Sequence, residues 1–193
     1  MPRKPREELE GAVHHVYARG NGKQRIFLDD QDRRTYLFLL RRVITQHEWR
    51  CLAYCLMGNH VHLLIETPQP NLGRGMQRLH GAYAQLFNER HGRVGHLFQG
   101  PYGAVRIESD EQLWMTLAYI AANPVRSDLC ERARDWHWSS YRHASRGAAA
   151  GLIDLERLAW YLSGFSTDPM RAYTDLVEGS DPLSVGDSRG LTP

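Results

Sequence analysis

The sequence has few cysteines and no long apolar run, and each absence narrows the class of protein. No stretch reaches the roughly 18 consecutive apolar residues that would cross a bilayer, and residues 1–10 are charged, unlike a secretory signal peptide. The three cysteines Cys51, Cys55 and Cys130 lack the CxxC spacing of metal sites, so we expect small buried thiols. We therefore expect a cytoplasmic protein without a membrane segment.

The length and the charge distribution suggest one domain that meets a polyanion. A chain of 193 residues, 42% of them hydrophobic, can bury one sizeable core. Residues 1–106 hold 16 Lys and Arg against 9 Asp and Glu, a net +7, whereas residues 107–193 hold 8 against 13, a net −5. The asymmetry favours a polyanion bound by the first half, and an unevenly charged, solvated surface is the alternative.

Strand-type and helix-type hydrophobic patterns alternate along the chain. Strands are predicted over residues 12–18, 52–57, 61–65 and 97–107, with Gly58-Asn59-His60 as a tight turn between the second and third. Helices are predicted over residues 30–46, 71–90 and 113–122. Ser109 should cap the last of these, with Gln112 completing a capping box, and Pro124 should end it.

This order predicts an α+β fold. Strand, helix, strand, strand, helix, strand is the βαββαβ order of a ferredoxin-like antiparallel sheet with its helices on one face. Residues 136–143 should form a packed cap, and residues 154–162 and 168–177 two short helices, the second with Pro169 in its first turn. We expect a main domain over residues 1–145, a C-terminal helical extension over 146–178 and a disordered tail over 179–193.

Two histidines lie two residues apart in a predicted strand. His60 and His62 therefore project from one face, while Val61, Leu63 and Ile65 face the opposite way. Neutral imidazoles are common ligands of divalent metals. Taken alone, the pair is more often a set of hydrogen-bonded structural residues.

A tyrosine and an asparagine share one face of the last predicted helix. Tyr119 and Asn123 are four residues apart, so a phenol lies one turn from an amide oxygen. Tyrosine can attack phosphorus and form a covalent intermediate, but a phenol with a pKa of about 10 needs activation by a base or a metal. A core aromatic and a helix end are the more common roles of such residues.

Several segments resemble one family of transposases. Residues 57–65 (MGNHVHLLI) resemble the His-hydrophobe-His motif of single-tyrosine transposases. The resemblance continues, in the expected order, through residues 15–21 (HVYARGN), 87–88 (FN), 93–100 (RVGHLFQG), 119–126 (YIAANPVR) and 136–141 (WHWSSY). Together these segments resemble the REP-associated branch of bacterial tyrosine transposases over residues 12–145.

The resemblance implies a ferredoxin-like HUH domain over residues 1–145 with a defined chemistry. It implies His60 and His62 as metal ligands, Asn123 as the third ligand and Tyr119 as the nucleophile. The implied enzyme cleaves and rejoins single-stranded, hairpin or REP-like DNA through a 5′-phosphotyrosine, with one Mg²⁺ or Mn²⁺ as cofactor. It also implies a monomer, with a dimer as the alternative.

The DNA is expected to meet basic and aromatic side chains, with each stacked base contributing roughly 1–3 kcal/mol. Phe98 and Tyr102 should be exposed near the sheet edge. Pro101 stands where the family places an arginine, and Arg93 or Arg106 is expected to replace that contact. The candidate DNA-binding residues are Arg3, Lys4, Arg6, Arg19, Arg74, Arg78, Arg90, Arg93, Phe98, Gln99, Tyr102 and Arg106.

Two other functions remain open on the residues alone. The two imidazoles would also suit a Zn²⁺-dependent metallohydrolase that uses an activated water. A domesticated, non-catalytic protein that binds hairpin DNA or structured RNA is the other alternative, and Pro101 is the departure that favours it. The presence of His60, His62 and Tyr119 together favours the enzyme.

Overall fold

One antiparallel sheet of four strands organises the chain. The computed structural model describes residues 8–146, 151–164 and 166–179. The strands are β1 (Ala12–Arg19), β2 (Arg50–Leu56), β3 (His60–Thr67) and β4 (Gly103–Arg106), in the order β2-β3-β1-β4. The central strands β1 and β3 pair along their whole length, from Ala12 opposite Thr67 to Arg19 opposite His60. The predicted α+β, ferredoxin-like fold is confirmed.

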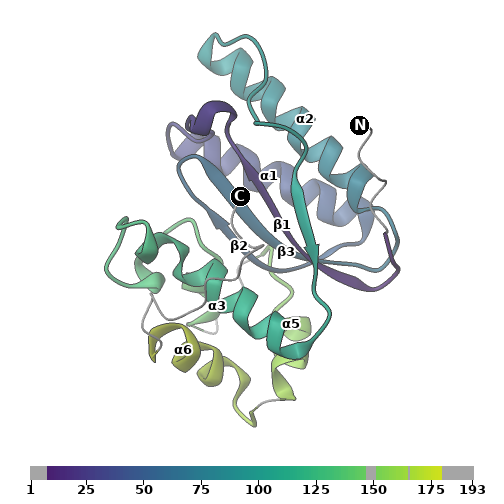
Figure 1. Cartoon of the computed structure of the whole chain (residues 1–193), viewed down its shortest axis with the longest axis vertical. Coiled ribbons are helices and arrows are strands. Elements are labelled where there is room, and N and C mark those ends of the chain that lie inside the picture. The colour runs from purple at the N-terminus through teal and green to yellow at the C-terminus, as the bar shows by residue number, and fades with distance from the viewer. Residues whose placement is uncertain (1–7, 147–150, 165, 180–193) are drawn as a thin grey trace.

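Two long helices cover one face of this sheet. These are α1 (Asp30–His47) and α2 (Leu72–His91), and they lie side by side behind the strands in Figure 1. The first helix begins at Asp30, as predicted, and Asp29 caps it, because the Asp29 side chain accepts a hydrogen bond from the Asp32 backbone N–H at 3.1 Å. Alternation along β3 turns Val61, Leu63 and Ile65 towards these helices, where they join the larger apolar core.

Helices cover the opposite face as well. The helices α3 (Asp110–Arg126), α5 (Leu155–Ser163) and α6 (Pro169–Gly179) pack there (Figure 1). The prediction of helices on one face therefore holds for α1 and α2, the helices of the βαββαβ unit, but not for the whole chain. The physical reason is that this second face also carries buried apolar residues, among them Leu52 and Leu64, which need a covering layer.

The α3 helix runs further than its sequence predicts. It begins after Ser109, whose hydroxyl accepts from the Gln112 backbone N–H at 3.1 Å, as expected. It passes through Pro124 and ends at Arg126, so the prediction that Pro124 ends it was wrong. Proline removes one N–H from the helix, yet the carbonyls of Asn123 and Pro124 still receive hydrogen bonds from downstream backbone N–H groups. The last turn therefore closes, and Arg126 joins the helix.

The fourth strand is shorter than predicted, because Gly103–Arg106 alone pairs with β1 as a ladder. The preceding residues form a loop held beside β1 by a bridge between Gly20 and Phe98 and by a 2.9 Å bond from the Gln99 N–H to the Arg19 carbonyl. Pro101 lacks the N–H that a ladder needs, which explains why the strand starts after it.

The C-terminal helices are fastened to the sheet by a buried carboxylate. Glu66 of β3 is 3% exposed and accepts from the Arg157 guanidinium of α5 at 2.8 and 3.0 Å. The two predicted short helices are present, with Asp154 as the cap of α5 and, as predicted, Pro169 in the first turn of α6. Three shorter helical elements complete the chain: η1 (Asn21–Lys23) after β1, and η2 (Ala133–Asp135) and α4 (Tyr141–Ala144) after α3.

Two further sequence predictions concern membranes and thiols. Within the described ranges, none of the helices has the length and apolar character to span a membrane. Cys51 and Cys55 are buried free thiols, as expected, while Cys130 is half-buried and also unpaired. The predicted tail beyond Gly179 lies outside the described residues.

Candidate active site

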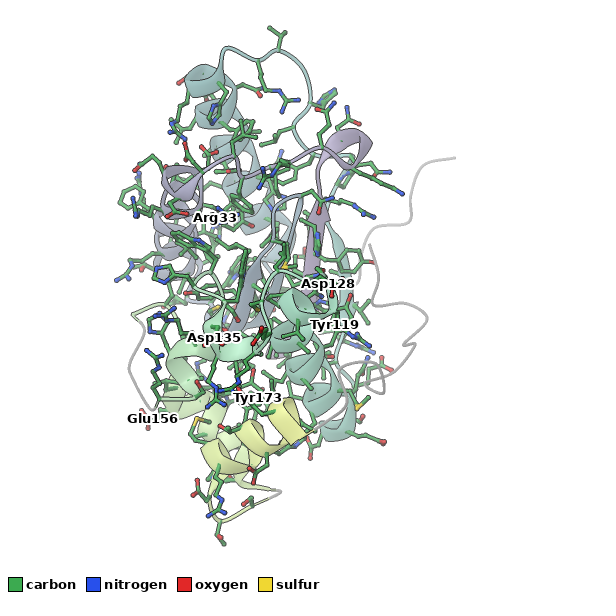
Figure 2. The ribbon with its side chains drawn as sticks, turned by 90° about the vertical axis from the view of Figure 1, so that its left-hand side faces the viewer. Arg33, Tyr119, Asp128, Asp135, Glu156 and Tyr173 are labelled. Atoms are coloured by element: carbon green, nitrogen blue, oxygen red, sulfur yellow. The ribbon has the colours of Figure 1, made fainter. Side chains whose placement is uncertain are left out.

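Four side chains, two from β3 and two from α3, meet between the sheet and that helix. His60 and His62 leave β3 on the face that α3 covers, with ring centroids 5.0 Å apart. His60 Nε2 lies 3.2 Å from Asn123 Oδ1. The ring of Tyr119 stands edge-on to His62 at 5.4 Å, and Figure 2 shows Tyr119 on α3, in the opposite layer from Arg33 of α1. The structure thus brings the predicted ligands and nucleophile into one site.

The hydrogen bonds of the turn fix the protonation of His60. Asn59 donates its amide N–H to the Lys23 carbonyl at 3.1 Å, so its Oδ1 is left as an acceptor. That oxygen is 2.7 Å from His60 Nδ1, which favours the tautomer with its proton on Nδ1. Burial lowers the pKa of His60 and so favours the neutral ring, and in this tautomer Nε2 carries a lone pair.

This lone pair faces a second acceptor, the Oδ1 of Asn123. Two acceptors 3.2 Å apart repel each other unless something positively charged lies between or beside them. A divalent cation that takes a nitrogen from His60 and an oxygen from Asn123 satisfies both atoms. The residues present therefore fit a metal ion.

His62 supplies a further free nitrogen. Its ring is fully buried, and burial together with the neighbouring His15 and His60 holds its pKa well below the usual range. Its Nδ1 is 3.0 Å from His15 Nε2, while its Nε2 has no hydrogen-bond partner among the described residues. Those residues contain no cluster of three His, Cys, Asp or Glu suited to a metal, so an oxygen of another kind, such as Asn123 Oδ1, would complete the set.

The Tyr119 phenol is shielded and protonated. The residue is 7% exposed, and burial raises its pKa above the ordinary value of 10. Two neighbours act in the opposite direction, namely a hydrogen bond from the Asn123 side chain and the positive charge of Arg126. The Arg126 guanidinium carbon lies 5.5 Å from the centre of the phenol ring. The phenol needs activation before it can attack, and these two groups favour its ionised form.

Sequence reasoning missed several residues of this site. Arg126 lies seven residues after Tyr119 and shares its helix face, but the predicted end at Pro124 left it outside the helix.

His15 and Tyr17 alternate along β1 towards the same face, with rings 5.2 and 6.4 Å from that of His62. Their alternation was visible in the sequence, but their position opposite β3 depends on strand register. A Cβ at position 103 would come within 2.2 Å of the Tyr17 ring, so a glycine is needed there.

Among the predicted DNA-binding residues, Arg19 lies at the site itself. It is paired with His60 across the β1–β3 ladder, and its charge helps to lower the pKa of His60. Its Nε is buried and has no hydrogen-bond partner within the part of the chain that the structure describes. A guanidinium in this position is suited to a phosphate oxygen.

Other predicted arginines lie further out. Arg90 is bound to the carboxylates of Asp29 and Asp32, Arg93 donates to Gln24 at 2.6 Å, and Arg106 donates to Glu108 at 2.6 Å. Arg74 and Arg78 are exposed on α2 and close enough to His47 of α1 to lower its pKa. Arg3, Lys4 and Arg6 lie outside the described residues.

The two aromatic candidates differ from the expectation of exposure. Tyr102 is 8% exposed, so that part of the prediction was wrong, because α2 and its own loop cover the ring. Phe98 is half-buried and stacks on His80 at 4.3 Å. Both line a cavity of about 670 Å³ between α2 and residues 95–102, with the exposed Gln99 on its wall.

Comparison with known proteins settles the family. The sequence profile of the family described as "Transposase IS200 like" matches residues 10–123, more than half of the chain. The chain belongs to the IS200-like transposase family. A solved REP-associated tyrosine transposase, bound to a REP hairpin, superimposes on this transposase with a TM-score of 0.64 over 76% of this chain and 87% of that one. Its sequence is 16% identical, so the likeness shows a shared fold.

A second solved structure is similar over less of the chain. It is a Deinococcus radiodurans R1 protein with a provisional transposase assignment, 18% identical, with a TM-score of 0.44 over 66% of this chain and 98% of that one. No curated protein matches the sequence.

Proposed function

We propose that this transposase cleaves and rejoins single-stranded DNA through a covalent 5′-phosphotyrosine at Tyr119, with one Mg²⁺ or Mn²⁺ held by His60, His62 and Asn123. The observation that carries the proposal is the 3.2 Å approach of His60 Nε2 to Asn123 Oδ1, next to His62 and the phenol of Tyr119. When bound, the cation would accept a phosphate oxygen and neutralise developing charge. REP-like hairpin DNA is the proposed substrate, supported by the basic first half of the chain and by the hairpin bound to the structural neighbour.

The side chain of Asn123 links the ligands to the nucleophile. Its Oδ1 points to His60, and its amide donates to the phenol of Tyr119. This bond favours the phenolate, as does the positive charge of Arg126. One residue would thus orient the attacking oxygen relative to the phosphate.

The proposed reaction exchanges a phosphodiester bond of the DNA for a phosphotyrosine bond and so retains the bond energy. The Tyr119 oxygen attacks phosphorus and loses its proton to solvent, while the bond between phosphorus and the 3′ oxygen breaks and that oxygen takes up a proton. The 5′ phosphate stays on Tyr119 until a 3′ hydroxyl attacks it and the phenol leaves. Arg19 and Arg126 would stabilise the phosphate through charge-assisted hydrogen bonds. No external energy source is required.

The site is complete within one chain, because β1, β3 and α3 of the same protomer supply every group named above. We therefore propose that a monomer is active. Light scattering of the purified protein with and without hairpin DNA tests this part of the proposal, and a dimer that alone carries activity would contradict it.

A nicking assay tests the reaction. Labelled REP-like hairpins with single-stranded flanks would be incubated with the full chain in Mg²⁺, Mn²⁺ or EDTA, and covalent protein–DNA adducts resolved on denaturing gels. Cleavage and adducts should require the cation and Tyr119. The matched control is Tyr173→Phe, which removes another buried phenol from the same side of the sheet and should leave cleavage intact.

The alternatives give different results in the same assay. If Tyr119→Phe still cleaves with a metal present and no adduct forms, the protein is a metallohydrolase that uses activated water. If the unmodified protein binds the hairpin but never cleaves it, the protein is a non-catalytic binder. Either result overturns the proposed reaction.

A further inference from the structure

His15 is a buried imidazole at the centre of the site with no assigned role. It is fully shielded from solvent, stacks on His62 at 5.2 Å and lies 5.9 Å from the Tyr119 ring. Burying a polar ring is costly unless its nitrogens find partners. Its Nδ1 has none among the described residues, so its one hydrogen bond, to His62, is the feature to explain.

That bond joins His15 Nε2 to His62 Nδ1 at 3.0 Å. At this distance one of the two nitrogens must donate and the other accept, and a neutral imidazole carries its proton on one nitrogen only. A single proton lies between them, and it belongs to one ring or the other.

The two arrangements have opposite consequences for the metal site. If His15 donates, the proton of His62 must sit on Nε2, and no lone pair is left for a cation. If His62 donates, its Nε2 is bare and available. The hydrogen bonds among the described residues do not distinguish the two arrangements, since His15 Nδ1 and His62 Nε2 lack partners in both. A cation at Nε2 permits the second arrangement and excludes the first.

His60 also has a hydrogen-bond acceptor beside its Nδ1. Asn59 Oδ1 accepts from His60 Nδ1 at 2.7 Å and leaves Nε2 of that ring for the cation. Each ligand thus has its own acceptor behind it, at the turn for His60 and on β1 for His62. Such acceptors fix the tautomer and the plane of a ligating histidine.

We propose that His15 is a positioning residue, which accepts the Nδ1–H of His62 and so presents His62 Nε2 to the divalent cation. This inference rests on the proposed metal site. It predicts that an acceptor is needed at position 15, not an imidazole as such.

Metal affinity separates an acceptor from a space-filling side chain. Mn²⁺ would be titrated into the full chain without DNA, and free Mn²⁺ followed by electron paramagnetic resonance. His15→Leu removes the acceptor and should weaken binding roughly 10- to 100-fold, the usual cost of losing such a partner. His15→Gln keeps an amide oxygen near the place of Nε2 and should recover most of the loss. The matched control is His14→Gln, a buried histidine on the other face of the same strand, which should bind like the unmodified protein.

A second measurement needs no variant. Long-range ¹H–¹⁵N spectra of the Mg²⁺-saturated protein should show both His15 and His62 protonated at Nδ1. A proton on Nε2 of His62 overturns the inference, as does unweakened Mn²⁺ binding by His15→Leu. If the unmodified protein binds no Mn²⁺, the proposed metal site itself is wrong, which is a different result from tight binding that ignores His15.

Discussion

The two faces of the sheet are made from the same strands but have different contents. Towards α1 and α2, β3 presents Val61, Leu63 and Ile65 to a continuous apolar core. Towards α3 it presents His60 and His62, and β1 adds His15. The two-residue period of a strand lets one segment stabilise the fold with one face and hold a reactive site with the other.

The second face depends more on distant contacts. His15 and His62 are 47 residues apart, and His60 and Asn123 are 63 apart. The α3 helix therefore serves twice, since it covers apolar residues of the sheet and also completes the site. Chemistry and packing are separated by face, and substitutions at neighbouring positions should separate them as well.

The largest expected effect is on cleavage by a variant of the α3 face. His62→Ala should reduce single-stranded DNA cleavage about a thousandfold or more, because it removes a ligand of a cation that supplies several kcal/mol of charge stabilisation. Leu63→Ala, one residue away on the other face, should cleave at a near-normal rate per folded molecule. Single-turnover rates at saturating Mg²⁺ check this, and equal losses for both variants would erase the distinction.

For the free energy of unfolding, Leu63→Ala should have the larger effect and His62→Ala the smaller. Leu63 is fully buried in the α1–α2 core, and Leu63→Ala should lower the free energy of unfolding by about 2–5 kcal/mol. His62→Ala leaves the apolar packing of that core in place and should cost less. Urea unfolding without metal measures both values. A larger loss for His62→Ala would show that the site face is the more important for stability.

Acid should destabilise the protein through His80, a half-buried histidine of α2. Burial lowers the pKa of His80 in the folded state to about 3, while its unfolded value is about 6.5. The unfolded chain then binds the proton first, so the contribution of neutral His80 is complete above about pH 6.5 and falls by up to roughly 1.4 kcal/mol per pH unit below it.

Urea unfolding at pH 7, 5.5 and 4 would measure that slope. His80→Gln should flatten it, whereas the exposed His96→Gln should leave it unchanged. A slope that His80→Gln does not alter would assign the acid sensitivity to other groups.

The smallest effect is expected in DNA binding. Arg19 lies beside His60 on the site face, whereas Arg78 lies on the outer layer near His47. If Arg19 contacts one phosphate, Arg19→Ala should make the slope of log binding constant against log salt less negative by about 0.7. Arg78→Ala should change this slope less. Titration of a fluorescent hairpin at several salt concentrations compares them, and a larger change for Arg78→Ala would place the DNA across α2 instead.

The sequence alone determined most of the secondary structure and half of the site. Alternation fixed the strands and put His60 and His62 on one face, and the helical spacing put Tyr119 and Asn123 on another. Helical spacing also placed the start of α1 at Asp30. These features are local, and local patterns record them directly.

Tertiary structure decided which of these faces meet. Strand register placed His15 behind His62, and a hydrogen bond to the Lys23 carbonyl held Asn59 beside His60. Backbone hydrogen bonds continued α3 past Pro124 and brought Arg126 to the phenol. Packing also buried Tyr102, which sequence reasoning expected to be exposed. The positions of His15, Asn59 and Tyr102 depend on groups far apart along the chain, whose proximity is set by the sheet and its two helical layers and not by any local pattern.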